Sequence, residues 1–171
     1  MSMLVVGMGD SRATKNIEDV LTTYALGSCI AVMIHDAVAG VGGLLHVMLP
    51  DSRLDAVKAK ARPCMFADSG IAELLTSVQR LGAARRNSSV WLAGGAQVLA
   101  HADGFNIGKR NYLAVRKLLW QQGLIVRGEE VGGTQSRTVR LCVATGQIWI
   151  KAGNTNASNA QDGDSQWRLM C

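Results

Sequence analysis

The residue types best suited to covalent chemistry lie in two segments of the first third of the chain. Cys29 directly follows Gly27 and Ser28, and His46 stands in the next hydrophobic run along the chain. A thiol becomes a good nucleophile when a neighbouring imidazole takes its proton or stabilises the thiolate. A glycine just ahead of the thiol lets the backbone approach a ligand closely and present amide N–H donors beside the sulfur. The pattern therefore indicates a cysteine nucleophile with a histidine base, provided that two adjacent strands place them side by side.

The same residues also have a purely structural interpretation. Free cysteine is among the most buried residue types, and spacing along the sequence does not separate a buried thiol from a reactive one. A third polar group favours catalysis, because a hydroxyl such as that of Thr23 can hold an imidazole in one tautomer, as the third member of a catalytic triad does. The residues alone leave both interpretations open.

The strands that must position these side chains follow from hydrophobic periodicity. Aliphatic and β-branched runs predict strands, and these runs lie at residues 3–8, 20–24, 29–34, 41–49, 90–92, 124–131, 138–144 and 147–151. We expect an exposed turn at His35 and Asp36, between the third and the fourth run. The last three runs are separated by glycine-containing turns, which predicts an antiparallel meander.

Two helices are predicted from apolar residues at helical spacing, one over residues 67–81 and one centred on residues 112–119. The residues expected to mark their ends are Asp68 or Ser69 and Gly82 for the first, and Asn106 and Gly123 for the second. Strands and helices together predict the class α/β (α+β), with mixed and antiparallel strands and about three helices packed outside them.

Length and composition indicate one folded domain. The chain has 171 residues, of which 48% are hydrophobic and 18% charged, and these values exclude a disordered protein and two full-sized domains. We expect the domain to cover residues 1–151 and to be followed by a polar, mobile tail at residues 152–171. The apolar runs are too short for a membrane span and the N-terminus has no basic start, so a cytoplasmic protein without membrane insertion is predicted.

Neither a metal nor a cofactor is predicted. The chain has 3 histidines, and its 4 cysteines share no close spacing, so no zinc pattern and no disulfide framework is indicated. Cys64, Cys142 and Cys171 are therefore expected to be free thiols without a role, and His101 is expected to be a loop residue. The net charge of +5 suits an acidic partner, but no nucleic-acid-binding module accompanies the basic residues, so nucleic acid is not predicted as a partner.

Several further segments form a pattern together with those around Cys29 and His46. They are residues 23–29, 36–43 and 46–50, Gly94-Gly95-Ala96, residues 107–111, and Val131-Gly132-Gly133 ahead of Arg137. Taken together, these segments resemble the CheD family of chemoreceptor glutamine deamidases. The similarity runs from about residue 3 to residue 151 and implies a layered sandwich like that of the toxin-type cysteine deamidases.

The resemblance also implies a site and a reaction. Cys29 would be the nucleophile, His46 the general acid/base, and Thr23 the polar partner that orients His46. Ser28 and Gly27 lie beside the nucleophile, and backbone N–H groups around Ser28 and Cys29 are the candidates for an oxyanion hole. The implied substrate is a glutamine side chain on the helical cytoplasmic region of a methyl-accepting chemotaxis receptor, hydrolysed to glutamate and ammonia. Some members of the family are also credited with hydrolysis of receptor methyl esters.

Two other functions stay open. Family members in some bacteria bind a CheC-type phosphatase of the response regulator, so a non-catalytic regulatory partner of such a phosphatase is the main alternative. A cysteine hydrolase of small amides or esters is a further alternative, and it would turn over free glutamine without any receptor helix. The variant Cys29→Ala separates an enzyme from a binding partner, because the enzyme loses turnover and the binding partner keeps its complex.

Overall fold

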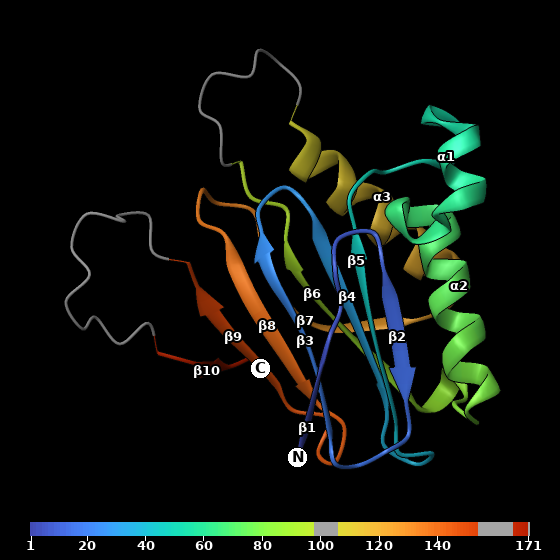
Figure 1. Ribbon diagram of the computed structural model, residues 1–171, viewed down its shortest axis with the longest axis vertical. Coiled ribbons are helices and arrows are strands. Elements are labelled where there is room, and N and C mark those ends of the chain that lie inside the picture. The colour runs from blue at the N-terminus through green and yellow to red at the C-terminus, as the bar shows by residue number, and fades with distance from the viewer. Residues whose placement is uncertain (98–105, 154–165, 171) are drawn as a thin grey trace.

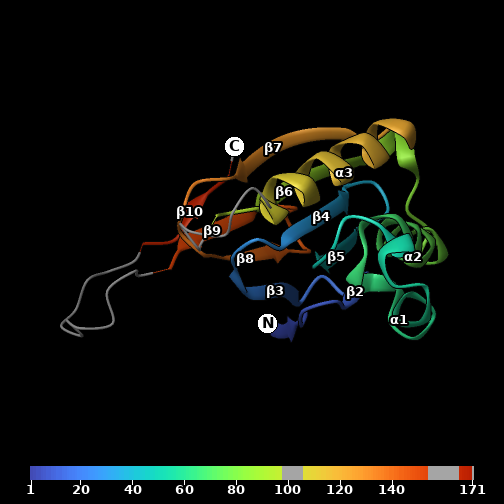
Figure 2. The same cartoon turned by 90° about the horizontal axis from the view of Figure 1, so that it is seen from above.

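Two β-sheets lie face to face, and helices cover the far side of one of them. The computed structural model describes residues 1–97, 106–153 and 166–170. The outer sheet has the strand order β1-β3-β8-β9-β10, and the central sheet, between the outer sheet and the helices, has the order β2-β5-β4-β6-β7 (Figures 1 and 2). The predicted layered α+β sandwich of mixed sheets with about three helices is confirmed.

The bounds of the elements are as follows. The outer sheet consists of β1 (Ser2–Val5), β3 (Asp19–Leu26), β8 (Arg137–Cys142), β9 (Ile148–Ala152) and β10 (Arg168–Leu169). The central sheet consists of β2 (Ser11–Thr14), β5 (Val41–Val47), β4 (Ile30–Asp36), β6 (Ser88–Gly94) and β7 (Ile125–Val131). The helices are α1 (Ala56–Ala61), α2 (Ala67–Arg80) and α3 (Ile107–Gln121), with short 3-10 turns at Ser52–Leu54, Pro63–Met65 and Arg85–Asn87.

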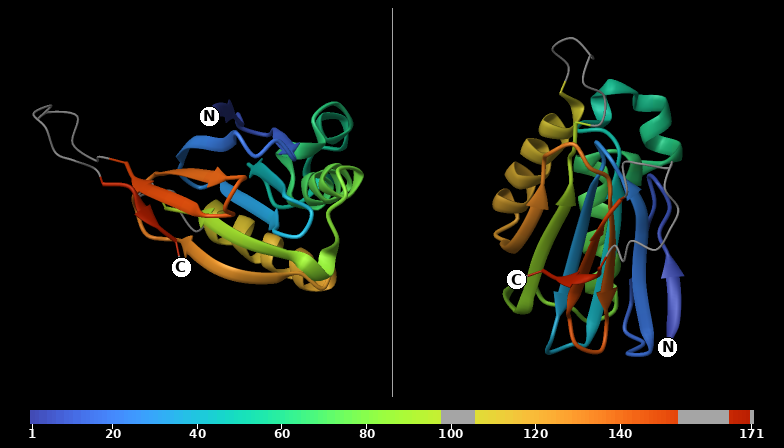
Figure 3. Two further views of the ribbon diagram at one scale, coloured as in Figure 1. Left: turned by 90° about the horizontal axis from the view of Figure 1, so that it is seen from below. Right: turned by 90° about the vertical axis from the view of Figure 1, so that its left-hand side faces the viewer.

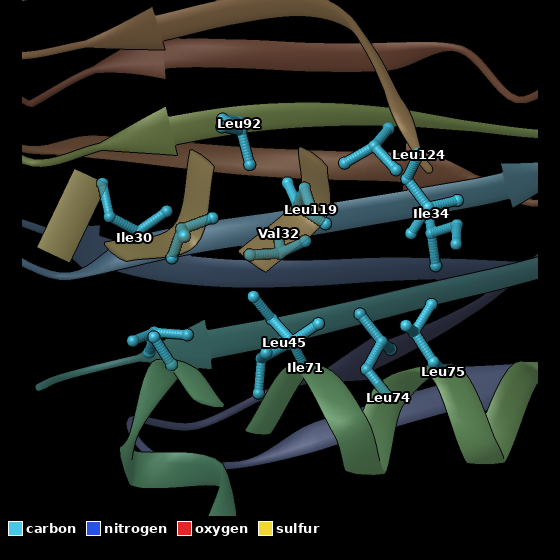
Figure 4. Close-up of a cluster of buried hydrophobic side chains, with 14 of the residues drawn as sticks. Ile30, Val32, Ile34, Leu45, Ile71, Leu74, Leu75, Leu92, Leu119 and Leu124 are labelled. Atoms are coloured by element: carbon cyan, nitrogen blue, oxygen red, sulfur yellow. The ribbon is translucent and has the colours of Figure 1, made fainter. Parts of the chain in front are cut away.

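Strand β4 explains why the molecule has two cores. Every residue of β4 is buried, because the strand is covered on both faces, and successive side chains of a strand point to opposite faces. Ile30, Val32 and Ile34 pack against α2 and α3, as Figure 4 shows for the labelled side chains. Ala31 and Met33 point the other way and pack against the outer sheet. The space between the two sheets is therefore a second, separate core, and it reaches the site described below.

The predicted turn at His35 and Asp36 is wrong. Both residues belong to β4 and are buried, with exposed fractions of 6% and 0%, and the turn comes after them. The Asp36 carboxylate accepts hydrogen bonds from the backbone N–H groups of Val38, Ala39 and Ala84. These donors replace the water that a buried carboxylate loses, and this is why a charged residue can end a central strand.

The predicted meander is also wrong in its first strand. β7 pairs in parallel with β6 in the central sheet, while β8 and β9 form an antiparallel pair in the outer sheet. Helix α3 connects β6 to β7, and a parallel neighbour requires such a crossover connection. Hydrophobic runs predict that strands exist, but they do not say which sheet each one joins.

The helix ends agree with the sequence at three of four places. The Asn106 side chain accepts from the backbone N–H of Lys109 and so caps α3, and Gly82 and Gly123 follow the helices with positive φ. The expected cap of α2 is wrong, because the N-cap is Phe66 and no side chain caps it. Asp68 in the first turn instead binds the backbone N–H and hydroxyl of Ser52.

Of the thiols, Cys29, Cys64 and Cys142 are free, as predicted, whereas Cys171 lies outside the described residues, as does His101. Within the predicted tail, residues 154–165 are likewise outside the description. Arg168–Leu169 pairs with β9 as β10, and the guanidinium of Arg140 lies 4.1 Å from the centre of the Trp167 ring. Among the helices of the described residues, none combines the length and the apolar character needed to cross a bilayer.

Candidate active site

The three residues predicted to carry chemistry come from three segments that meet at one end of the sandwich. Thr23 lies in β3, Cys29 in the connection from β3 to β4, and His46 near the end of β5. Figures 1 and 3 show this connection and the end of β5 at the same end of the molecule as the start of α3. We call it the Cys29 end, and the opposite end, where β4 finishes, the His35 end.

Sheet register brings Cys29 and His46 to the same face. His46 of β5 pairs with Ala31 of β4, so the two side chains point to the same face of the sheet. Cys29 lies in the bend that leads into β4 and not in a strand, and its packing partners put it on that same face. Cys29 packs against the core between the two sheets and is half-buried, while His46 is fully buried.

The hydrogen bonds of Thr23 fix the tautomer of His46. The Thr23 hydroxyl donates to the carbonyl oxygen of Val6 at 2.7 Å, and its oxygen lies 2.7 Å from Nδ1 of His46. A hydroxyl has one proton to donate and a carbonyl can only accept. Nδ1 must therefore carry a proton and donate it to Thr23, which leaves Nε2 of the neutral ring with a free lone pair. Thr23 thus occupies the orienting position that the sequence predicted for it, and Val6 is a partner that the sequence analysis missed.

The free nitrogen of His46 has no partner. Among the described residues, nothing forms a hydrogen bond with the buried Nε2 atom, so the thiol of Cys29 and the imidazole share a face without being hydrogen-bonded in this state. An unpaired buried polar atom is costly and calls for an explanation. An unprotonated ring nitrogen on the same face as a half-buried thiol is suited to take a proton when a reaction occurs there.

Burial keeps both groups uncharged at rest. Loss of water lowers the pKa of His46 from 6.5 to about 4. Burial raises the pKa of the Cys29 thiol above its usual value, and the backbone N–H of Cys29 itself partly opposes this shift. At neutral pH the pair is therefore a neutral thiol and a neutral imidazole, and charge separates only when the sulfur finds an electrophile.

The backbone around Cys29 is held from outside. The carbonyl oxygen of Gly27 accepts from the backbone N–H of Ala96 at 2.8 Å, and that of Cys29 accepts from Gly95 at 2.8 Å. The carbonyl oxygen of Ser28 accepts from the side chain of Asn111 at 3.0 Å. In a trans peptide the N–H points away from the C=O, so the N–H of Ser28 faces away from Ala96 and the N–H of Cys29 faces away from Asn111.

Two glycines make this close approach possible. Gly94 has a φ of 109°, and a Cβ there would collide with the carbonyl oxygen of Cys29. Gly95 has a φ of 62°, so both conformations suit glycine and few other residues. The pair thus supports residues 27–29. Among the described residues, no three His, Cys, Asp or Glu side chains gather as they would around a metal ion.

Comparison with known proteins gives a consistent picture. The family model described as "CheD chemotactic sensory transduction" matches residues 48–152. A protein of Solibacter usitatus named "Probable chemoreceptor glutamine deamidase CheD" is 49% identical over 151 residues, which cover 88% of this chain and 89% of that protein. A "Probable chemoreceptor glutamine deamidase CheD 1" of Syntrophus aciditrophicus is 46% identical over 152 residues, covering 89% of this chain and 95% of its own.

The family model begins after Thr23, Cys29 and His46, but the pairwise alignments include them. Any stretch that covers 88% of this 171-residue chain contains residues 23–46. Among solved structures, a Neisseria meningitidis protein titled with the family DUF152 matches at 11% identity with a TM-score of 0.46, over 78% of this chain and 64% of that one. That likeness is too low to support an argument.

Proposed function

The chain belongs to the CheD family, and on that premise we propose that it hydrolyses glutamine side chains of chemoreceptors to glutamate and ammonia, with Cys29 as the nucleophile. The relatives named above are chemoreceptor glutamine deamidases, and this activity makes the protein a protein-glutamine amidohydrolase. One observation carries the proposal: Nε2 of His46 has no partner among the residues that the structure describes, and Thr23 holds it as an acceptor on the face that Cys29 shares.

In the proposed first step, the sulfur of Cys29 attacks the carbon of the substrate carboxamide while Nε2 of His46 takes the thiol proton. Both groups are neutral at rest and buried, so a separate thiolate and imidazolium would be costly before attack. Proton transfer and attack therefore occur together. The negative charge moves to the carboxamide oxygen, which needs donors, and we assign this role to the N–H groups of Cys29 and Ser28.

The next steps return each group to its starting state. His46 donates the proton from Nε2 to the departing nitrogen, and ammonia leaves as the C–N bond breaks, which gives a thioester on Cys29. Nε2 then takes a proton from a water molecule as its oxygen attacks the thioester carbon. The C–S bond breaks, the thiol regains its proton from His46, and glutamate is released. Throughout the cycle Nδ1 keeps its proton and donates a hydrogen bond to the Thr23 hydroxyl.

Mass spectrometry of a receptor cytoplasmic fragment tests the proposal. Incubation with the wild-type protein is expected to convert particular glutamines to glutamate, while Cys29→Ala and His46→Ala convert none above the protein-free control. Conversion by all three proteins would contradict the roles proposed for Cys29 and His46. Free glutamine and a simple ester, offered in parallel, distinguish a receptor deamidase from a hydrolase of small amides or esters, because only the latter turns them over without a receptor.

The proposal places the protein in the cytoplasm, where the helical region of the receptors is accessible to it. The alternative, a regulatory partner of a CheC-type phosphatase, is tested with the same variants. If binding to such a phosphatase were the function, Cys29→Ala would keep the complex and the wild-type protein would leave the receptor glutamines unchanged.

A further inference from the structure

Asn111 is a fully buried polar residue on a helix face that is otherwise apolar. It shares the buried face of α3 with Gly108, Val115 and Leu119. Burying an amide side chain without partners is unfavourable, so an asparagine in this position needs a reason. Both protons of its amide group are used, since Nδ2 donates to the carbonyl oxygen of Ser28 at 3.0 Å and to that of Met48 at 2.9 Å.

These two carbonyl groups lie where β4 and β5 separate. The ladder between the two strands ends at the pair Ile30 and Val47, and Ser28 and Met48 lie just beyond it on the two diverging segments. One of these segments carries Cys29 and the other follows His46. Beyond the end of the ladder, the amide of Asn111 thus links the two segments by hydrogen bonds. It connects the segment that carries Cys29 to the segment that follows His46.

We propose that Asn111 is a positioning residue for the deamidation, which fixes the peptide between Ser28 and Cys29 so that the N–H of Cys29 points at the oxyanion. Because the C=O and N–H of a trans peptide point in opposite directions, holding the Ser28 carbonyl toward α3 directs the Cys29 N–H to the opposite side. That N–H lies close enough to the Cys29 sulfur to lower the pKa of the thiol against the effect of burial. This inference rests on the proposed function.

Gly108 provides independent support, because it holds the same helix against the same segment. A Cβ at Gly108 would lie 2.6 Å from the carbonyl oxygen of Gly95 and 2.9 Å from that of Ala96, so the first turn of α3 packs directly on backbone. Gly95 and Ala96 are the residues whose N–H groups bind the carbonyl oxygens of Cys29 and Gly27. Gly108 and Asn111 are three positions apart and thus on one face of the helix.

The expected effect is on the chemical step. In Asn111→Ala the Ser28 to Cys29 peptide is free to rotate, and loss of a fixed oxyanion donor lowers kcat, by about 10- to 100-fold for an indirect effect of this kind, with KM little changed. Asn111→Asp keeps the volume but sets acceptor oxygens against two carbonyl oxygens, so its kcat falls at least as far. Alkylation of Cys29 by iodoacetamide forms no oxyanion, so in both variants its rate at each pH is expected to fall less than kcat does.

Val115→Ala is the matched control. Val115 lies one turn further along α3 and is fully buried in the apolar core, so its truncation lowers stability without touching residues 27–29. We expect Val115→Ala to lose as much thermal stability as Asn111→Ala while it keeps the wild-type kcat, with every rate normalised to the folded fraction. A kcat of Asn111→Ala within about twofold of wild type, or a loss equal to that of Val115→Ala, would overturn the proposal.

A measurement on the wild-type protein keeps the proposal testable if the variants fold poorly. The side-chain NH₂ protons of Asn111, assigned by NMR, are expected to exchange with solvent far more slowly than those of an exposed asparagine, because both are hydrogen-bonded and buried. Exchange at the rate of an exposed amide would overturn the inference. If the wild-type protein itself converts no receptor glutamine, the proposed function fails. The NMR result then tests the two hydrogen bonds of Asn111 separately from that function.

Discussion

The molecule contains two buried histidines that point into the space between its sheets, one at each end of the central strands, and their surroundings are opposite. At the His35 end, Nε2 of His35 donates to the carbonyl oxygen of Val143 at 2.9 Å, and the ring fits so closely against Gly146 that a Cβ there would overlap it. At the Cys29 end, Nδ1 of His46 donates to Thr23 and Nε2 has no partner among the described residues.

The difference lies in hydrogen bonding and not in burial, since both rings are at least nine-tenths buried. At the His35 end, burial by itself would raise the pKa of Asp36, but three backbone N–H donors outweigh it and lower that pKa below its ordinary value. At the Cys29 end, Nε2 of His46 and Oδ1 of Asn111 are buried, and neither has a hydrogen-bond partner in the described part of the chain. At the His35 end the polar groups stabilise the fold through hydrogen bonds. At the Cys29 end two polar atoms remain able to accept a hydrogen bond.

Replacing each histidine by alanine gives the largest expected contrast. His46→Ala removes the acid/base group and lowers turnover of a receptor fragment by about 1,000-fold or more. His35→Ala leaves the Val143 carbonyl unpaired and costs about 1–3 kcal/mol of stability, with turnover per folded molecule unchanged. Steady-state kinetics and urea unfolding of both variants are the measurements. Equal losses of turnover in the two variants would remove the distinction between the ends.

The neighbouring threonines of β3 sharpen the contrast further. Thr23→Val takes away the acceptor for Nδ1 of His46, frees the ring to change tautomer, and is expected to lower kcat by about 10- to 100-fold. Thr23→Ser retains the hydroxyl and most of the rate. The control is Thr22→Val, since the Thr22 hydroxyl is equally buried but donates to the Val139 carbonyl on the other side of the strand. If Thr22→Val lost as much kcat as Thr23→Val, the tautomer argument would be wrong.

The neutral state of His46 predicts how stability depends on pH. Its pKa is 6.5 in the unfolded chain and about 4 when buried, so between these values the unfolded state binds a proton that the folded state does not. Neutral His46 therefore contributes to the free energy of unfolding. This contribution is complete above the pKa of the unfolded state and is lost as the pH falls toward the pKa of the folded state, by about 3 kcal/mol in all. Urea unfolding across this range should show a shallower pH dependence for His46→Gln than for wild type. Identical slopes would mean that His46 is not buried in neutral form.

A pair of glycines provides the smallest contrast. Gly94→Ala and Gly146→Ala both place a side chain at positive φ, where a Cβ would overlap the Cys29 carbonyl oxygen in one case and the His35 ring in the other. Each is expected to cost about 1–3 kcal/mol of stability. Only Gly94→Ala should also lower turnover per folded molecule, because only it displaces the nucleophile segment. Turnover lost equally in both would show that the rate follows stability alone.

Much of the site could be predicted from the sequence because its parts are local. Thr23, Cys29 and His46 lie within two adjacent strands and the segment before them, and the last two share one face. The role of His35 could not be predicted, since its partner is the carbonyl of Val143, 108 residues away. The contact of Asn111 with Ser28 likewise spans 83 residues. In the sequence, the only indication of this contact is that Asn111 is a polar residue on the apolar face of the predicted helix.

The same reasoning explains the errors in the fold. Periodicity detects whether a segment has one covered face or two, so the strands and both long helices were predicted near their observed positions. It does not detect pairing partners, and β7 was therefore assigned to a meander with β8 and β9 although it joins the central sheet beside β6. Asp68 was taken for a helix cap because the competing partner, Ser52, lies in another turn.

Strand β1 has a consequence for anyone preparing this protein. Its register against β3 places Val6, whose N–H binds the Thr22 carbonyl at 2.8 Å and whose own carbonyl takes the Thr23 proton. The tautomer of the buried His46 ring is thus set by residues 2–6. A recombinant version trimmed of residues 1–5, or carrying a purification tag that draws them away, is expected to fold and yet to work poorly.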